Sequence, residues 1–143
     1  MLVALLALAL TASTTEMLAA TATPPCFDWV VVGHLTSQTY VGPLPVGPGE
    51  LTLDSVFSSE AVIDTVLLGK NAPKRTELFL VAHTEIPPQG ASNLMMILGQ
   101  DANGQINLLQ RQHLRGFKGI LVTRAAARRF AAESGLAQCG PPP

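Results

Sequence analysis

The chain has 143 residues, which is enough for one domain and little more. Hydrophobic residues make up 48% of it and charged residues 13%, a balance that excludes an intrinsically disordered chain. A formal net charge of −1 and an aromatic content of 5% argue against nucleic acid as a partner, because the chain offers neither a basic field nor enough stacking platforms.

The first ten residues form an apolar run that is typical of a secretory signal peptide. The run is too short to cross a bilayer, which takes about 20 apolar residues. Ala20-Thr21-Ala22 supplies a small-residue cleavage pattern, so we expect cleavage after Ala22, with Ala19 and Ala20 as alternatives. No Lys or Arg precedes the run, and a buried N-terminal helix is the other interpretation. The prediction is a signal peptide at 1–22 and one periplasmic or secreted domain at 23–143, with no transmembrane segment in the mature chain.

The two cysteines, Cys26 and Cys139, lie at opposite ends of the mature chain. An even count in a small exported domain predicts a disulfide. Such a bridge would close a loop of more than a hundred residues, which the chain-entropy treatment values at about 4–5 kcal/mol. Two unrelated thiols are the alternative.

The strand predictions begin with Asp28–Thr36 (DWVVVGHLT), a dense β-branched run. Gly33 inside it predicts a bulge or a sharp bend, as at a barrel corner. Thr36–Thr39 is expected to begin a polar loop. Gly42–Gly49, which contains three glycines and three prolines, is expected to continue it as a loop.

Three further apolar segments are predicted to be strands. Glu50–Phe57 alternates leucines with polar residues, Val62–Leu68 continues the β character, and Glu77–His83 is a third run. The residues 58–61 are either a bulge in one long bent strand or a turn between two strands. Ile86–Gly90 is expected to be a loop.

A hairpin and a helix are predicted in the last third. Leu94–Gln100 and Gln105–Gln112 flank Asp101–Gly104, where Asn-Gly is expected to supply positive φ. Thr123 can cap a helix over Arg124–Ser134, and Gly135 stands at the position of a C-terminal glycine cap. The expected apolar stripe of this helix consists of Ala126, Ala127, Phe130 and Ala131.

About five strands and a terminal helix predict a mainly β fold, a small five-stranded OB-type barrel with one C-terminal helix. Closure of the barrel would leave no unpaired sheet edge. A β-sandwich is the alternative architecture.

The order of these segments resembles that of a known family. A cysteine precedes Asp28-Trp-Val-Val-Val-Gly-His34, followed by strands ending Val66-Leu-Leu-Gly-Lys70 and Val81-Ala-His-Thr84. Over roughly residues 26 to 113, this pattern resembles netrin-like, or tissue-inhibitor-of-metalloproteinase-like, OB-fold domains and their exported bacterial relatives. The resemblance implies an OB barrel, an N-terminal cysteine held by a disulfide, and a role in binding or inhibiting other proteins.

In the animal inhibitors the mature chain begins with the cysteine, whose amino group and carbonyl chelate the protease zinc. That role could fall only on Cys26. Pro25 is a poor residue to precede a signal cleavage site, and cleavage after Ala22 would leave Cys26 without a free amine. The animal proteins also carry more than one disulfide. These departures argue against the chelating mechanism in this chain.

Histidines and serines are the candidate residues for a chemical site. His34 and His83 could meet if their strands are neighbours, with Asp28, Asp54 or Glu85 beside them, although no H-x-x-x-H or C-x-x-C spacing is present. Ordinary strand histidines are the alternative, and the same holds for His113. No serine stands in a G-x-S-x-G motif, and the sequence pairs no serine with a base. This holds for the available serines Ser37, Ser55, Ser58 and Ser59.

Basic residues gather in the last third of the chain. Six of the nine lie from residue 111 onward, where the one acidic residue is Glu133; they are Arg111, Arg115, Lys118, Arg124, Arg128 and Arg129. Arg124, Arg128 and Arg129 are either an interaction face for an acidic partner or anionic lipid, or an ordinary solvated helix face.

The preferred hypothesis is an exported binding or inhibitor-like module without enzymatic activity or cofactor, whose partner is an exported or envelope protein. The alternative is an exported metal-dependent hydrolase, or a metal-binding protein, that uses His34 and His83.

Overall fold

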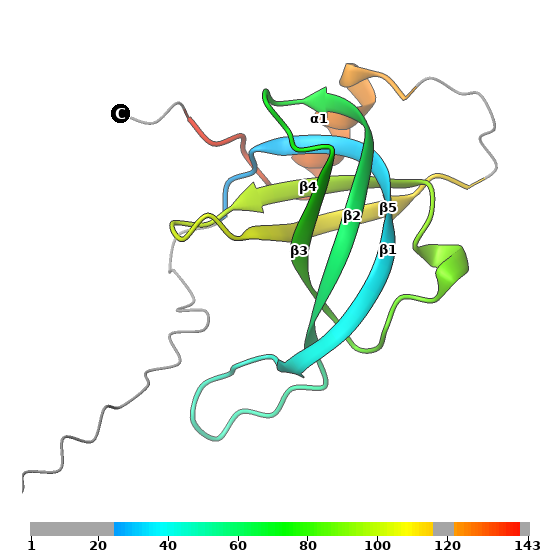
Figure 1. Ribbon diagram of the computed structural model, residues 1–143. Coiled ribbons are helices and arrows are strands. Elements are labelled where there is room, and N and C mark those ends of the chain that lie inside the picture. The colour runs from blue at the N-terminus through cyan, green and yellow to red at the C-terminus, as the bar shows by residue number, and fades with distance from the viewer. Residues whose placement is uncertain (1–24, 116–121, 141–143) are drawn as a thin grey trace, which may run out of the picture.

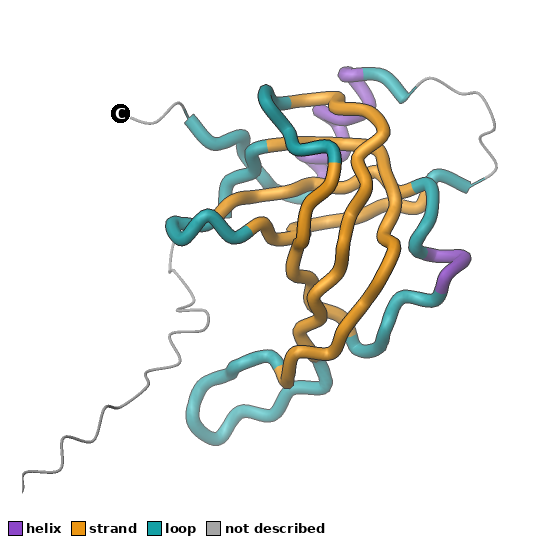
Figure 2. The backbone as a smooth tube through the Cα atoms, viewed as in Figure 1, coloured by secondary structure: helices purple, strands orange, loops and turns teal. Residues whose placement is uncertain are grey.

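The computed structural model of the chain describes residues 25–115 and 122–140. Within them the chain forms five strands and one α-helix, with a short 3₁₀ turn between the third and fourth strands (Figures 1 and 2). The predicted signal peptide at 1–22, its cleavage sites and Lys118 lie outside the described residues. Among the described helices, none is long and apolar enough to cross a membrane.

The five strands close into one barrel. They are β1 (Trp29–Pro43), β2 (Ser55–Leu68), β3 (Arg75–Ala82), β4 (Leu94–Gln100) and β5 (Ile106–His113). Their order around the barrel is β1-β2-β3-β5-β4, with β1 returning to pair with β4. The β3–β5 pair is parallel and the other pairs are antiparallel. This is the OB-type arrangement, and the predicted fold class is confirmed; a sandwich of two sheets is not formed.

Two apolar clusters hold this arrangement. The first fills the barrel, and Val31, Leu78 and Met96 are among its fully buried members. The second lies between the outer face of the barrel and α1 (Arg124–Glu133), where Ala127 and Ala131 are buried. Alternate residues of β4 point into the two clusters, so β4 is apolar on both faces and its first six residues are all buried.

The strand β1 is longer than predicted. The expectation of a polar loop beginning at Thr36–Thr39 is wrong, because β1 stays paired with β2 as far as Pro43↔Ser55. Ladder hydrogen bonds form between backbone groups, and the polar side chains here lie on the more exposed half of the strand. Only the part of the predicted Gly42–Gly49 loop that follows Pro43 is a loop.

The course of β2 decides whether residues 58–61 are part of one long strand or a turn between two strands. It runs unbroken over Ser55–Leu68, so these residues belong to one long strand. The predicted start at Glu50 is wrong. Residues 50–54 alternate like a strand but lie outside the sheet, since β3 ends at Ala82, opposite Ser55.

The predicted hairpin and helix are confirmed. The carboxylate of Asp101 accepts hydrogen bonds from the backbone N–H groups of Asn103 and Gln105, both at 2.9 Å. Gly104 takes the positive φ of 81°, whereas Asn103 does not have a positive φ. At α1, the hydroxyl of Thr123 accepts from the N–H of Ala126 at 3.1 Å, and Gly135 has φ 70°.

The bulge predicted at Gly33 is also confirmed. The register between β1 and β2 shifts between Val32 and Gly33. A Cβ placed on Gly33 would overlap the carbonyl oxygen of Val62 and would lie 3.2 Å from the Cα of Ile63. Glycine is therefore required by the close approach of two backbones rather than by its own φ.

Candidate functional site

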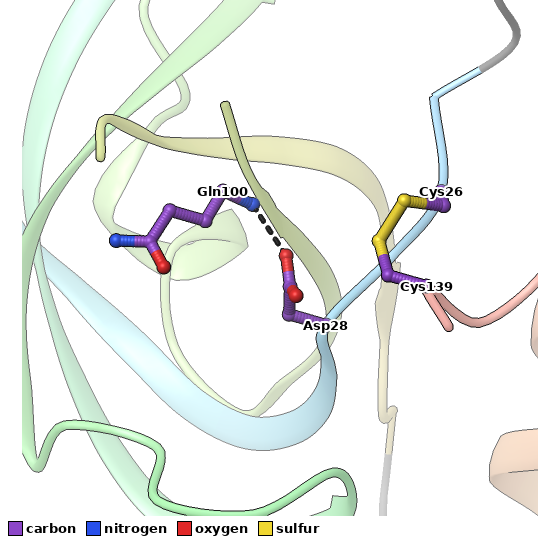
Figure 3. Close-up of a disulfide and its surroundings, with 4 residues drawn as sticks. All are labelled: Cys26, Asp28, Gln100 and Cys139. Atoms are coloured by element: carbon purple, nitrogen blue, oxygen red, sulfur yellow. Dashed lines mark hydrogen bonds between the residues drawn. A yellow bond between two sulfur atoms is a disulfide. The ribbon is translucent and has the colours of Figure 1, made fainter. Parts of the chain in front are cut away.

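The disulfide joins the two ends of the described chain, as predicted. The Cα atoms of Cys26 and Cys139 are 4.8 Å apart, and the bridge spans 113 residues of sequence. Beside it, the N–H of Cys139 donates to the carbonyl of Phe27 at 2.8 Å. Figure 3 shows the Asp28 carboxylate turned toward β4, where it accepts a hydrogen bond from the backbone N–H of Gln100 at 2.7 Å. Asp28 is thus used in holding the start of β1 to the end of β4.

His34 and His83 lie against separate aspartates. Nδ1 of His34 lies 3.5 Å from the carboxylate of Asp64, and Nδ1 of His83 lies 2.7 Å from that of Asp54. Both imidazoles are partly exposed, with 39% and 73% of the side chain accessible. Asp64 was not considered from the sequence; it lies next to Ile63, the residue that pairs with Gly33.

The structure does not bring His34 and His83 together. His34 is level with Val62 on β2, whereas His83 follows Ala82, which is level with Ser55. The seven residue steps from Ser55 to Val62 amount to about 23 Å along β2 at roughly 3.3 Å per step. Over residues 25–115 and 122–140, no group of three or more His, Cys, Asp and Glu side chains could hold a metal ion. This geometry does not favour the metal-dependent alternative.

Two serines on β2, Ser58 and Ser59, have structural partners. The hydroxyl of Ser58 donates to the carboxylate of Glu77 at 2.9 Å. Ser59 is buried and donates to the carbonyl oxygen of Ser37 on β1. Among the described hydrogen bonds, none joins a serine to a histidine, and the chain shows no activated serine there.

The basic residues separate into two surfaces. Arg124, Arg128 and Arg129 are exposed on α1. Arg111 lies near the end of β5 and Arg115 just beyond it, both exposed. The two sets belong to different elements, β5 and α1, which meet in the apolar cluster that contains Leu109 and Ala127.

A three-residue polar cluster lies on the outer face of β1, β2 and β3. The carboxylate of Glu60 accepts hydrogen bonds from the guanidinium of Arg75 at 2.7 Å and from the hydroxyl of Thr36 at 3.1 Å. The hydrogen bond from Arg75, aided by that from Thr36 and by the charge of Arg75, lowers the pKa of Glu60. The pairing Glu60↔Glu77 places a second carboxylate beside it, and Ser58 binds that one.

Replacing Arg75 with glutamine is expected to raise the pKa of Glu60 toward its ordinary value, because the largest cause of its lowering is removed. A lowered pKa in the folded state favours folding at neutral pH, and this contribution is lost as the pH falls through that pKa. The Arg75→Gln variant should therefore lose less stability on acidification than the wild type. An NMR titration of the Glu60 carboxyl measures the shift, and Lys74→Gln is the charge-matched control, which should leave the titration unchanged.

The loop between β1 and β2 exposes large apolar side chains. Leu51 is 100% exposed and Leu53 85%, and Tyr40 at the end of β1 is 59% exposed. Val41 and Val46 add to the same region. Figure 1 shows this loop extending from one end of the barrel, while α1 covers the other end.

The loop is tied down at several points although its leucines are free. The N–H of Leu44 donates to the carbonyl of Asp54 at 2.9 Å, and Asp54 in turn holds His83. Within the loop, the N–H of Gly47 donates to the Glu50 carboxylate at 3.2 Å and the N–H of Glu50 to the carbonyl of Gly47 at 3.1 Å. The leucines are therefore presented on a shaped loop. The alternation of Leu51 and Leu53 with polar residues predicts a strand. Among the described residues no strand pairs with this segment, so both leucines lie on the surface.

Comparison of this chain with protein-family models, with curated proteins and with solved structures finds no match.

Proposed function

We propose that this protein is an exported binding module that recognises another protein through the β1–β2 loop. The observation that carries the proposal is the full exposure of Leu51 and the 85% exposure of Leu53 on a loop anchored at both ends. Large apolar side chains that are exposed together on one loop are typical of an interaction site. A netrin-like or inhibitor-like role would be served by such a loop.

Export is the second part of the proposal. A disulfide forms and persists in oxidising compartments and is uncommon in the cytosol. The bridge together with the signal-like N-terminal sequence supports a periplasmic or secreted location. The partner would then be an exported or envelope protein.

The loss of binding affinity expected on removal of the two leucines can be estimated from their burial. Fully burying one leucine side chain contributes about 1.5–3 kcal/mol, so burying both against a partner would contribute about 3–6 kcal/mol before ordering costs. Each 1.4 kcal/mol corresponds to about a tenfold change in Kd. Removing both side chains should therefore weaken binding by at least about a hundredfold.

The test compares capture of partners from envelope and secreted fractions by three forms of the protein. Leu51→Ser/Leu53→Ser should lose a protein that the wild type recovers reproducibly, with no change in the thermal unfolding transition, because both residues lie outside the core. The captured protein is then purified and its Kd measured for each form.

The charge variant Arg124→Gln/Arg128→Gln on α1 is the control, because α1 lies at the opposite end of the barrel (Figure 1). It should bind as well as the wild type. Loss of binding in this variant with retention in the leucine variant would assign the interface to the basic helix face instead. Recovery of no reproducible protein would contradict the proposal as a whole.

A further inference from the structure

The strand β5 has an open edge. It pairs with β4 along its whole length, as far as Leu94↔His113. On its other side it meets β3 at one position, Phe79↔Asn107. Beyond that point, residues 108–113 have no strand partner on this edge among the described residues.

The backbone groups that face this edge follow from the ladder. The N–H of Leu114 donates to the carbonyl of Asn93 at 2.9 Å, one position beyond Leu94↔His113. Since hydrogen-bonded pairs alternate in an antiparallel ladder, the N–H and C=O groups of Arg111 and His113 point away from β4. In agreement, the N–H of Arg111 donates to the side chain of its neighbour Gln110 at 3.1 Å.

The side chains of the same two residues lie on the inner face of the sheet. Arg111 is level with Met96 and His113 with Leu94, and both of these β4 residues are buried inside the barrel. Arg111 and His113 are nevertheless exposed. The parallel pairing Phe79↔Asn107 places the end of β3, Ala82, level with Gln110, so Arg111 and His113 lie in an opening beyond the end of β3.

Two adjoining hollows fill the opening, and both are lined by Pro87. The first, about 400 Å³, is lined by Arg111 and by Asp54, Val81, Ala82, His83, Thr84, Glu85, Ile86 and Pro87. The second, about 520 Å³, is lined by Pro87, Gln89, Gly90, His113 and Arg115. Together they form a groove along β5, which we call the β5 groove.

The charges of the β5 groove are ordered. Arg111, His113 and Arg115 lie along its β5 side, and none of them has a carboxylate within 4.0 Å in the described part of the chain. The opposite wall combines the apolar side chains of Val81 and Pro87 with the polar side chains of His83 and Thr84. The carboxylates of Asp54 and Glu85 lie in the first hollow only, and that of Asp54 holds His83.

We infer that the β5 groove binds an extended acidic peptide segment, which adds as a strand to the open edge of β5 with carboxylates at alternate positions over Arg111, His113 and Arg115. Backbone donors and acceptors at the edge supply the strand pairing, and the alternating basic side chains select the sequence. The surface uses residues other than the leucines of the β1–β2 loop, and the inference does not depend on the function proposed above.

The same charges disfavour other occupants. Pairing of two β5 edges from two copies would bring the Arg111 and Arg115 side chains of the two copies close together, and like charges directly opposite each other destabilise a strand pair. Inward-facing charges at an edge also protect it from unselected strands. An acidic strand would instead be attracted by the basic side chains at this edge.

The test uses two synthetic peptides, acetylated and amidated, that differ only in charge: Thr-Val-Glu-Val-Glu-Val-Thr and Thr-Val-Lys-Val-Lys-Val-Thr. The glutamate peptide should bind and shift the backbone amide NMR signals of Arg111 and His113, and added salt should weaken it. Arg111→Gln/Arg115→Gln should raise its Kd at least tenfold. Arg111→Lys/Arg115→Lys should retain most of the binding, and Arg124→Gln/Arg128→Gln on α1 should match the wild type.

Four results would overturn the inference. They are equal binding of the lysine peptide, an unchanged Kd in Arg111→Gln/Arg115→Gln, amide shifts confined to other strands, and no binding of the glutamate peptide at millimolar concentration. Binding of dextran sulfate without binding of the glutamate peptide would assign the groove to a polyanion rather than a peptide strand. Thermal unfolding of each variant checks that the barrel is intact.

Discussion

Gly33→Ala is expected to lower the free energy of unfolding by about 3 kcal/mol or more, which is a large part of the total stability of a domain this size. The added methyl group would overlap the carbonyl oxygen of Val62, which belongs to the backbone of β2. No side-chain rotation can relieve this overlap. The chain would have to separate β1 from β2 at the bulge, where the two strands otherwise pair on both sides. Urea denaturation of the purified domain measures the loss.

Gly42→Ala is the matched control for that variant. Gly42 lies in the same strand, has no positive φ, and a Cβ placed on it would have no atom within 4 Å. We expect its free energy of unfolding to stay within about 0.5 kcal/mol of the wild type. Equal losses at the two glycines would show that the close approach to Val62 does not limit residue 33.

Removal of the disulfide by Cys26→Ser/Cys139→Ser is expected to lower the free energy of unfolding by about 4 kcal/mol. The bridge spans 113 residues, and closing a loop of about this length restricts the unfolded chain by roughly 4–5 kcal/mol, with measured values often lower. The folded barrel should change little, because Phe27 keeps its backbone bonds to Ala137 and Cys139. Urea denaturation with and without the two cysteines gives the difference.

The slope of that denaturation distinguishes the causes. An unfolded chain without the bridge is more expanded and exposes more surface, so the m-value should rise in the double variant. Wild type treated with reductant should behave in the same way. A stability loss with an unchanged m-value would place the effect in the folded state, at the contacts around Phe27.

Much of the fold follows from local signals in the sequence. The hairpin at Asp101–Gly104 and the helix that begins after Thr123 are specified by residues a few positions apart, and both form where predicted. The cysteine count predicted the disulfide, and Gly33 predicted the bulge. The hairpin and the helix depend on short-range chemistry, whereas the disulfide and the bulge were indicated by residue type although their partners lie far away in the sequence.

The wrong boundaries concern pairing between distant segments. Thr36–Thr39 has the composition of a loop but is held in β1 by the backbone of β2. Residues 50–54 have the alternation of a strand but have no neighbour, since β3 ends at Ala82. Side-chain patterns indicate which face of a strand is buried, whereas strand length depends on where a partner begins and ends.

The candidate surfaces needed the structure for the same reason. The sequence shows the charges of Arg111 and Arg115. Their position beside an unpaired edge depends on where β3 ends, because β3 pairs with β5 at one position only. His34 and His83 were candidates for a shared site, and the register assigns them to Asp64 and Asp54 instead. The sequence predicts the second half of the β1–β2 loop as part of a strand. In such a strand, the face that carries Leu51 and Leu53 would be covered.

Because Cys26 and Cys139 lie close together, the same barrel can be built from a chain that starts at another position. With Cα atoms 4.8 Å apart, the two positions can be joined by a short peptide, and the chain can be cut between Gly47 and Gly49. Every strand pairing survives this circular permutation, because the cut falls outside the sheet. In a permuted chain the leucines at 51 and 53 would stand close to a free amino terminus, where a tag or a second domain could be attached beside them.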